Sequence, residues 1–275
     1  TRANAAFTNV LTYGSEDLRV IRLHLNEFLD AYFAAKESGD APKDIVEDLK
    51  KALPETLRKA LAGVPKNKLP LDIGLFGRMQ GGTPLPHLDG AANSIFSYST
   101  HEAHPIFDFF VATDDLSKEV GTGMMGSSSY ASGTFVRSMR IDRELLYSNT
   151  GMTSEEDSRF CDMVGTLAKV MTQVNPGGKQ KSAASHEMAG FTFVAMSDTP
   201  MNLAATFENP IKANGNGYME PSIRRFLSYY KKLKETQDID AVEACISMHD
   251  LDDVEFPNRL SNISEFSDWL KSARG

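Results

Sequence analysis

The chain has few cysteines and no long apolar run. Its two cysteines, Cys161 and Cys245, form neither a CxxC pair nor a metal-type spacing, which gives no support to a disulfide framework or a cysteine metal site. No apolar stretch approaches the roughly 20 residues that a membrane helix needs, and no signal-peptide pattern opens the chain. We therefore expect a cytoplasmic protein with no membrane partner.

Positive charge is also in deficit. Twenty-nine Lys and Arg residues face 37 Asp and Glu residues, for a net charge of −8, which argues against a generic nucleic-acid binder. The deficit is concentrated between Lys234 and Gly275, where ten acidic residues face four basic ones. Because the remainder is close to neutral, a local basic groove that binds a polyanion stays compatible with the composition.

Nucleotide-binding motifs are incomplete. Residues Gly121–Gly126 match G-x-G-x-x-G, but a β-type run follows where a dinucleotide fingerprint must open a helix. Gly178-Lys179 is no P-loop, because Gln180 stands where Ser or Thr is needed. We expect no nucleotide cofactor.

Metal and nucleophile signals are equally weak. His101 and His104, and Asp114 with Asp115, have no neighbours in sequence that complete a ligand set. No G-x-S-x-G or Cys/His arrangement supplies a nucleophile. We expect no metal and no catalytic residue.

The periodic segments predict an α+β fold. Residues 1–64 are typical of helices, with an apolar stripe that is most simply core, at Leu18, Ile21, Leu25, Phe28, Leu29 and Tyr32. Strands are predicted at Phe107–Thr113 (buried), Gly133–Ile141 and Phe191–Met196, with a Gly/Ser/Met-rich connector at 120–131. A helix with a Thr153-x-x-Glu156 capping box runs to about Val174, and shorter helices follow from Pro221 and near Phe266. This order matches a split βαβ sheet without its first strand and helix.

Three features are suited to binding a nucleic acid. Lys179-Gln180-Lys181 after Pro176-Gly177-Gly178 offers mobile cations for phosphates. Of the adjacent Phe109 and Phe110, one side chain can face outward as a stacking platform for a base, although burial of both fits the pattern equally well. Met124 and Met125 in the connector are flexible apolar side chains suited to contacting bases or a neighbouring protein.

An ordered series of short motifs between Leu71 and Phe226 resembles a known family, the backbone (CasC) subunits of the type I-E CRISPR Cascade surveillance complex. The matching segments are Ile73–Met79 (IGLFGRM), Asp89-Gly90-Ala91, Thr100-His101, Asp108–Leu116 (DFFVATDDL), Ser132–Arg137 (SGTFVR), Pro176–Ala183 (PGGKQKSA), Ser197-Asp198, Ala205–Ile211 (ATFENPI) and Tyr218–Ile223 (YMEPSI).

The resemblance implies a hand-shaped protein with an RRM-like (ferredoxin-like) palm, helical fingers and a β-hairpin thumb. It implies fingers at residues 1–70, a finger-to-palm junction at 71–106, a palm at 107–235 with the thumb at about 116–131, and an acidic extension with a terminal helix at 236–275. The family normally begins with a palm strand and a basic helix, and nothing before Gly14 is similar to either. The palm is therefore expected to lack its first strand in this sequence.

The resemblance also implies a function. Copies would multimerise along a CRISPR guide RNA as a non-catalytic scaffold, with other Cascade subunits and the target DNA strand paired to the guide as further partners. The RNA-binding positions carried over are Arg78, Met79, Phe109, Phe110, Met124, Met125, Arg137, Lys179, Gln180 and Lys181. The alternative is a related effector backbone that cleaves target RNA with Asp114 or Asp115.

Overall fold

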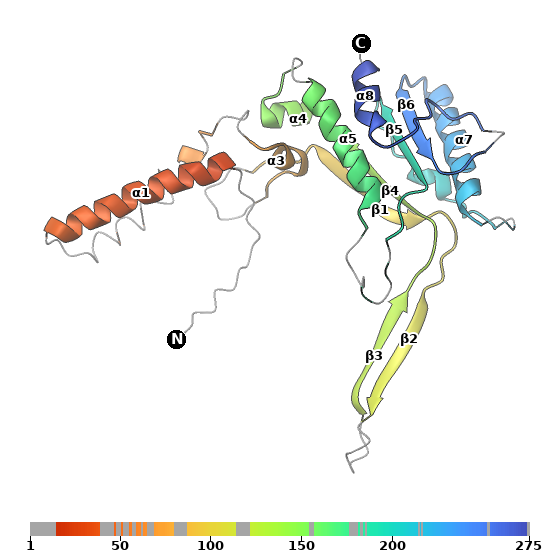
Figure 1. The fold of residues 1–275 in the computed structure, drawn as a ribbon, viewed down its shortest axis with the longest axis horizontal. Helices are drawn as coiled ribbons and strands as arrows, with labels where there is room; N and C mark the ends of the chain where they lie inside the picture. The colour runs from red at the N-terminus through yellow and green to blue at the C-terminus, as the bar shows by residue number, and fades with distance from the viewer. Residues whose placement is uncertain are drawn as a thin grey trace. The chain divides into compact units, whose positions relative to one another are not determined.

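The structure is a computed structural model that describes residues 15–38, 47, 51, 55–56, 59–61, 63–64, 69–79, 87–113, 122–153, 157–175, 181, 184, 186–213, 215, 217–251 and 254–273. The chain divides into two units, each described here by itself: residues 1–95 with 139–157, and residues 96–138 with 158–275. Figure 1 labels the helices and strands. In the described part of the chain, no helix combines the length and apolar character needed to cross a membrane.

In the first unit, α1 (Ser15–Ser38) confirms the predicted helix and corrects the expectation that its apolar stripe is core. Leu18, Leu25 and Leu29 are all more than 40% exposed, as is Phe33. Residues spaced by four and seven positions share one helix face. An apolar stripe therefore lies on the surface of α1.

Two short helices of the first unit, α3 and α4, pack together and are linked by hydrogen bonds from Asn149. Helix α3 (Leu71–Phe76) contacts α4 (Arg143–Thr150), which begins at an Asp142 cap whose carboxylate accepts a hydrogen bond from the Leu145 amide. The buried Asn149 side chain donates to the carbonyl oxygens of Gly74 and Asp89, at 3.0 and 2.7 Å. These bonds join α4 to α3 and to the segment that contains Asp89.

The described residues form three two-stranded sheets, with orders β1-β4, β2-β3 and β5-β6. Strands β1 (Ala92–Ser99) and β4 (Phe135–Ile141) make up the first. The sequence predicted β4 but not β1, because the β1 sequence alternates small polar residues with few apolar ones and carries a weak strand signal.

The β2-β3 hairpin corrects two sequence-based predictions. Phe107–Thr113 was expected to be a buried strand, yet β2 (Ile106–Thr113) pairs antiparallel with β3 (Thr122–Tyr130) in an exposed ribbon. The residue 120–131 segment, read as a connector, supplies the second strand. Figure 1 shows this hairpin extending away from β5 and β6 within the second unit. Its first strand starts ten residues earlier than the expected thumb boundary of 116.

The β5-β6 sheet holds the core of the second unit. Strand β5 (Phe191–Met196), which the sequence predicted with the same bounds, pairs antiparallel with β6 (Val242–Ser247), which it missed. Helices α5 (Asp157–Gln173) and α8 (Glu265–Ser272) contribute Ala168 and Phe266 to one cluster with Ala244. Helix α7 (Met219–Gln237) packs Ile223 and Leu227 against Phe191 and Phe193 in another cluster. The successive residues Phe193 and Val194 enter different clusters, as alternation along a strand requires.

The start of α5 leaves one prediction open. The Thr153-x-x-Glu156 capping box lies partly outside the described residues. From Asp157 onward the helix forms as its three- and four-residue apolar spacing predicted.

Candidate nucleic-acid interface

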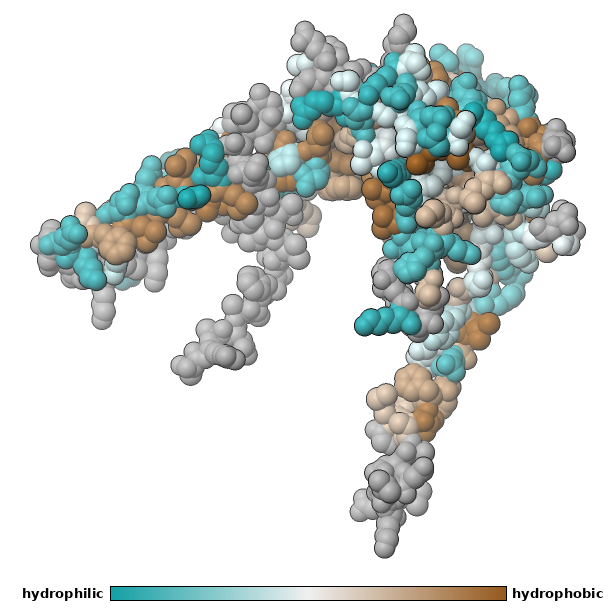
Figure 2. All heavy atoms as spheres, in the orientation of Figure 1, coloured by the Kyte–Doolittle hydropathy of each residue, from teal (hydrophilic) through white to brown (hydrophobic). Residues whose placement is uncertain are grey.

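Both faces of the β2-β3 hairpin carry exposed apolar side chains. Directly paired residues lie on the same face, so Val111 and its partner Met125 share one face with Phe109. Ala112 and its partner Met124 share the other face with Phe110. Figure 2 shows apolar residues gathered along the described part of the hairpin. The ribbon thus offers apolar contact surface in two directions.

The two phenylalanines predicted as alternatives both lie on this surface. Phe109 is 61% exposed and pairs with Ser127, a small residue. Phe110 is 42% exposed and lies over Gly126, where an added Cβ would come within 2.7 Å of the ring's Cζ. Burial of both rings, which the sequence pattern allowed equally well, is not what the structure shows, because each ring is more than 40% exposed.

Met124 and Met125 are exposed to about the same degree as Phe109, at 59% and 62%. The register places them on opposite faces, close to the hairpin turn. A flexible thioether side chain adapts its shape to whatever it contacts. The residue types at this end of the hairpin therefore suit irregular partners such as splayed bases.

Phe96, which the sequence reasoning missed, is the most exposed large apolar residue described. It lies on β1 and is 95% exposed. Its neighbours in sequence, Ser97 and Ile95, belong to the alternating pattern of a strand, so Phe96 shares its face with the residues two positions away. The signal that could have identified the strand is the Ile95-Phe96 pair of strand-favouring residues within a short polar stretch.

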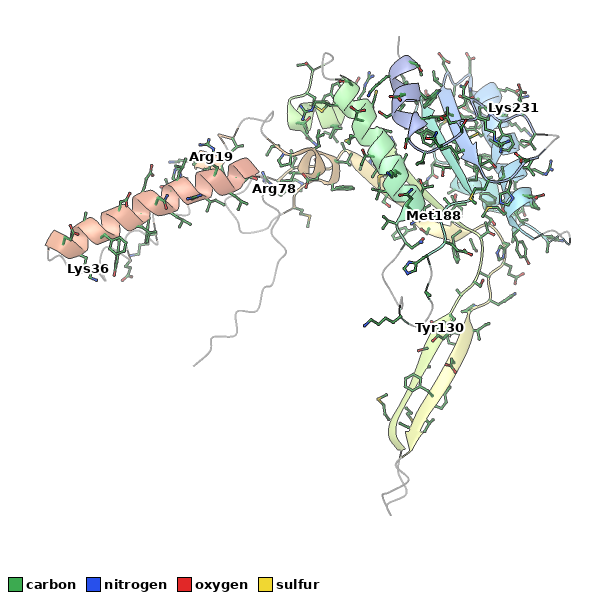
Figure 3. All side chains as sticks on the ribbon, viewed as in Figure 1. Arg19, Lys36, Arg78, Tyr130, Met188 and Lys231 are labelled. Carbon is green, nitrogen blue, oxygen red and sulfur yellow. The ribbon has the colours of Figure 1, made fainter. Side chains whose placement is uncertain are left out.

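Arg78 has a protein partner. Its guanidinium Nη1 lies 2.6 Å from Asp17 Oδ2, and both side chains are at most 1% exposed. Figure 3 shows Arg78 beside the start of α1. Breaking a buried ion pair is costly, so this pair gives Arg78 a structural role, and its contact with RNA stays a prediction. Met79, next along the chain, is 87% exposed and stays a candidate contact.

Of the basic candidates, Arg137 lies at the C-terminal end of α5. Arg137 on β4 donates from Nη1 to the Val174 carbonyl and from Nη2 to the Met171 carbonyl, both at 2.6 Å. Lys181 follows and is exposed. Lys179 and Gln180 lie outside the described residues, as do Asp114 and Asp115. The structure therefore gives Arg137 backbone partners, and its contact with RNA stays a prediction.

The two histidines considered as metal ligands have other partners. His101 is buried: its Nδ1 donates to the Glu102 carbonyl and its Nε2 accepts from the Thr134 amide. His104 is exposed, and its Nε2 lies 3.5 Å from Glu102 Oε1. Among the described residues, no three His, Cys, Asp or Glu side chains group closely enough to hold a metal ion.

His101 belongs to a structural junction. Its ring stacks on Tyr218 with centroids 3.7 Å apart, and the neighbouring Thr100 accepts a hydrogen bond from Ser222 Oγ at 2.8 Å. The Thr100 carbonyl also accepts from the Ile211 amide. These contacts tie the end of β1 to the start of α7.

The glycine motif gives no nucleotide site either. Gly126 lies in β3 and pairs with Phe110, where a dinucleotide fingerprint would have to open a helix.

Cys245 is a poor nucleophile, because burial raises its pKa to about 11 and keeps the thiol protonated near neutral pH. The exposed side chains of the described hairpin are mainly apolar and aromatic, which is suited to binding.

Comparisons with known proteins identify what the chain is similar to. The family model of CT1975-like proteins matches residues 2–269. None of the curated proteins matches the chain.

Two solved structures share the fold. A chain described as "CRISPR RNA-guided surveillance complex, pre-nicking" has a TM-score of 0.64 and 24% identity, and the alignment covers 75% of this chain. It covers 56% of that chain, so the present sequence spans little more than half the length of that neighbour. A second, described as "CRISPR RNA-guided surveillance complex", has a TM-score of 0.63 and 22% identity, with 83% of this chain and 85% of that one covered. These likenesses confirm the predicted α+β, RRM-like fold class.

Proposed function

The chain belongs to the family of CT1975-like proteins, and from that membership we propose that it is a guide-RNA-binding scaffold of a CRISPR surveillance complex. More specifically, we propose a backbone subunit of the type I-E Cascade kind, located in the cytoplasm. Its partners would be the guide RNA, further copies of itself, other Cascade subunits and the target DNA strand paired to the guide. Its role is to bind and to arrange, without catalysis.

The observation that carries this proposal is the exposed apolar hairpin. An isolated two-stranded ribbon is marginally stable in water, and one with apolar side chains on both faces gains by being covered. Stacking of a base on an aromatic side chain is worth roughly 1–3 kcal/mol and tolerates any base. Phe109, Phe110, Met124 and Met125 therefore suit a partner whose sequence varies, as the spacer of a guide RNA does.

Local positive charge also supports RNA as the partner. Lys181 is exposed just beyond the end of α5, and Lys179 precedes it in sequence. The net charge of −8 does not oppose RNA binding here, because the acidic excess lies mainly after Lys234. Phosphate contacts from lysine carry no base preference, so they complement stacking in sequence-independent recognition.

The decisive experiment is size-exclusion chromatography with light scattering on protein produced with and without a CRISPR RNA. We expect RNA-dependent growth into multimers that protect the guide from nuclease. A monomer that is indifferent to RNA would contradict the proposal.

A matched pair of methionine variants assigns the binding to the hairpin. Met125→Ala should weaken multimer formation on the guide, because Met125 is 62% exposed on the ribbon. Met248→Ala removes a methionine that is even more exposed (75%) and lies just after β6, and it should leave assembly unchanged. Equal effects of both variants would show that the hairpin is not the binding element.

The ribonuclease alternative has its own test. The assembled protein should leave labelled target RNA intact under conditions in which it binds the guide. Cleavage that disappears in Asp115→Ala while guide binding persists would replace the scaffold proposal with the nuclease.

A further inference from the structure

A histidine side chain closes the base of the β2-β3 hairpin. The Thr100 amide donates to the Thr134 carbonyl at 2.9 Å, as in a strand ladder. The Thr134 amide, however, donates to His101 Nε2 at 3.1 Å, while the Thr100 carbonyl accepts from the Ile211 amide. These two bonds to Thr134, the hairpin closure, put an imidazole nitrogen in the place of a backbone carbonyl.

The ring of His101 is fixed in this place. It stacks on Tyr218 with an angle of 17° between the rings, and a Cβ added at Gly133 would lie 3.2 Å from Nε2. A backbone amide only donates and a carbonyl only accepts. Nε2 therefore carries no proton, and Nδ1 donates its own to the Glu102 carbonyl at 2.8 Å. The surrounding backbone thus requires the neutral ring in one tautomer.

The closure is anchored to the core of its unit through α7. Thr100 is 1% exposed, and its Oγ1 forms a hydrogen bond with Ser222 Oγ at 2.8 Å. Ile223, next to Ser222, is 2% exposed within a core cluster. Tyr218, which stacks on His101, is the residue that precedes α7. His101 therefore connects this core to the base of the hairpin.

The closure is also the last tie before the hairpin begins. Segments 102–105 and 131–133, both described, form no backbone hydrogen bond with each other. The next paired residues are Ile106 and Tyr130, the first pair of the hairpin, and Figure 3 labels Tyr130 at this end. A two-stranded ribbon is only marginally stable by itself, so it takes its direction from its attachment. That attachment is the closure.

We propose that neutral His101 is a positioning residue that closes the base of the hairpin and so holds Phe109 and Met125 where a nucleic acid meets them. The proposal rests on the proposed function for its ligand. His101 is 8% exposed, so it acts through the hairpin and not by touching the ligand.

The first test needs no RNA. Amide hydrogen exchange at Thr134 reports how often the closure opens, since a hydrogen-bonded amide exchanges when its bond opens. His101→Phe keeps a ring for Tyr218 to stack on but has no acceptor, so it should raise the Thr134 exchange rate about tenfold. An unchanged rate would overturn the proposal whether or not the protein binds RNA.

Two further variants make this result specific. Gly133→Ala keeps His101 but puts a methyl group 3.2 Å from its Nε2, so it should raise the Thr134 rate by a smaller factor. His104→Ala is the matched control and should leave the rate unchanged, because His104 is exposed and pairs with Glu102. An equal rise in His104→Ala would mean that the segment opens independently of the closure, which would overturn the proposal.

The second test separates positioning from direct contact and from stability. His101→Phe should weaken guide binding about tenfold at a temperature where circular dichroism shows the variant to be folded. His101→Gln, whose side-chain oxygen can accept from the Thr134 amide, should restore part of the affinity. Native affinity in folded His101→Phe would overturn the proposal.

A background that already lacks the hairpin contacts completes the second test. In a chain with Phe109→Ala and Met125→Ala, His101→Phe should cause no further loss, because residues that act through one another are not additive. An imidazole that touches the guide would instead weaken binding in both backgrounds, and that result would overturn the proposal. If the native chain binds no RNA, the proposed function fails, while hydrogen exchange at Thr134 still decides whether His101 closes the hairpin.

Discussion

At the scale of single residues, the motif glycines and polar residues mostly serve the fold. Gly77 has φ = +78°, and a Cβ there would come within 2.6 Å of the Gly90 amide nitrogen. Both glycines belong to the short motifs that carry the family resemblance. Their close backbone approach sets the position of Arg78, the next residue. The glycines of this motif therefore serve packing, while Met79 beside them is exposed.

Gly77→Ala should destabilise the first unit by about 1–3 kcal/mol, because it combines a left-handed backbone with a clash against backbone atoms that cannot rotate away. Urea unfolding measures the loss. Gly215→Ala is the matched control, since Gly215 also has positive φ (+91°) but no atom lies within 4 Å of the added Cβ. Equal losses in both variants would mean that the backbone conformation alone sets the cost.

Asp17→Ala should lower the free energy of unfolding by about 3–5 kcal/mol, because it leaves the Arg78 guanidinium buried without its carboxylate. Thermal or urea unfolding gives the value. The double variant Asp17→Ala with Arg78→Met should recover most of the loss, since it removes the buried charge as well. A double variant no more stable than the single one would show that the ion pair is not the source of the effect.

At the scale of elements, the spacing of apolar residues predicted the helices and strands that pack on the core of their own unit. The apolar spacing of α5 and the compact run of β5 placed both elements, because each packs one or two continuous apolar faces on the core. The exposure of the hairpin could not be predicted from its apolar pattern. An apolar run such as Ile106–Thr113 looks the same whether other elements of the chain or another molecule cover it.

Contacts between distant elements were also beyond sequence reasoning. Arg78 meets Asp17 across 61 positions, and Ser222 meets Thr100 across 122. A single sequence shows which residues are polar but not which of them pair. Arg78 and Arg137 were both carried over as RNA-binding positions, and the sequence did not show that the fold gives each a protein partner.

The contact between α5 and α8 makes a pH-dependent prediction. Hydrogen bonds from Lys271 and Ser267 lower the pKa of Asp162 below its ordinary value. A carboxylate with a lowered pKa stabilises the folded state above its unfolded pKa of about 3.9, and this contribution is lost as the pH falls through the folded pKa. Asp162→Asn should thus lower the melting temperature slightly at pH 7 and make little difference at pH 2.5. A difference of the same size at both pH values would contradict the assignment.

At the scale of the whole molecule, the negative charge is concentrated at one end of the chain. The acidic excess after Lys234 leaves the remainder nearly neutral, so the guide binding that we propose would depend on a few local cations and on stacking. Affinity should then be nearly independent of the guide's spacer sequence.

Changing Lys179 and Lys181 together to alanine should weaken guide binding by a similar factor for every spacer. Each lost phosphate contact should lower the slope of log affinity against log salt by about 0.7. Titrations of two or three unrelated guides at several salt concentrations measure both quantities. A loss that depends on the spacer sequence would contradict backbone recognition.

The uncovered hairpin has a consequence for the life of the protein in a cell. A copy without its partner displays aromatic and methionine side chains on an open ribbon, which is the kind of surface that chaperones and proteases recognise. Copies made in excess of their ligand would be removed, while assembled copies would persist. The supply of the ligand would then set the abundance of the protein, with no dedicated regulator.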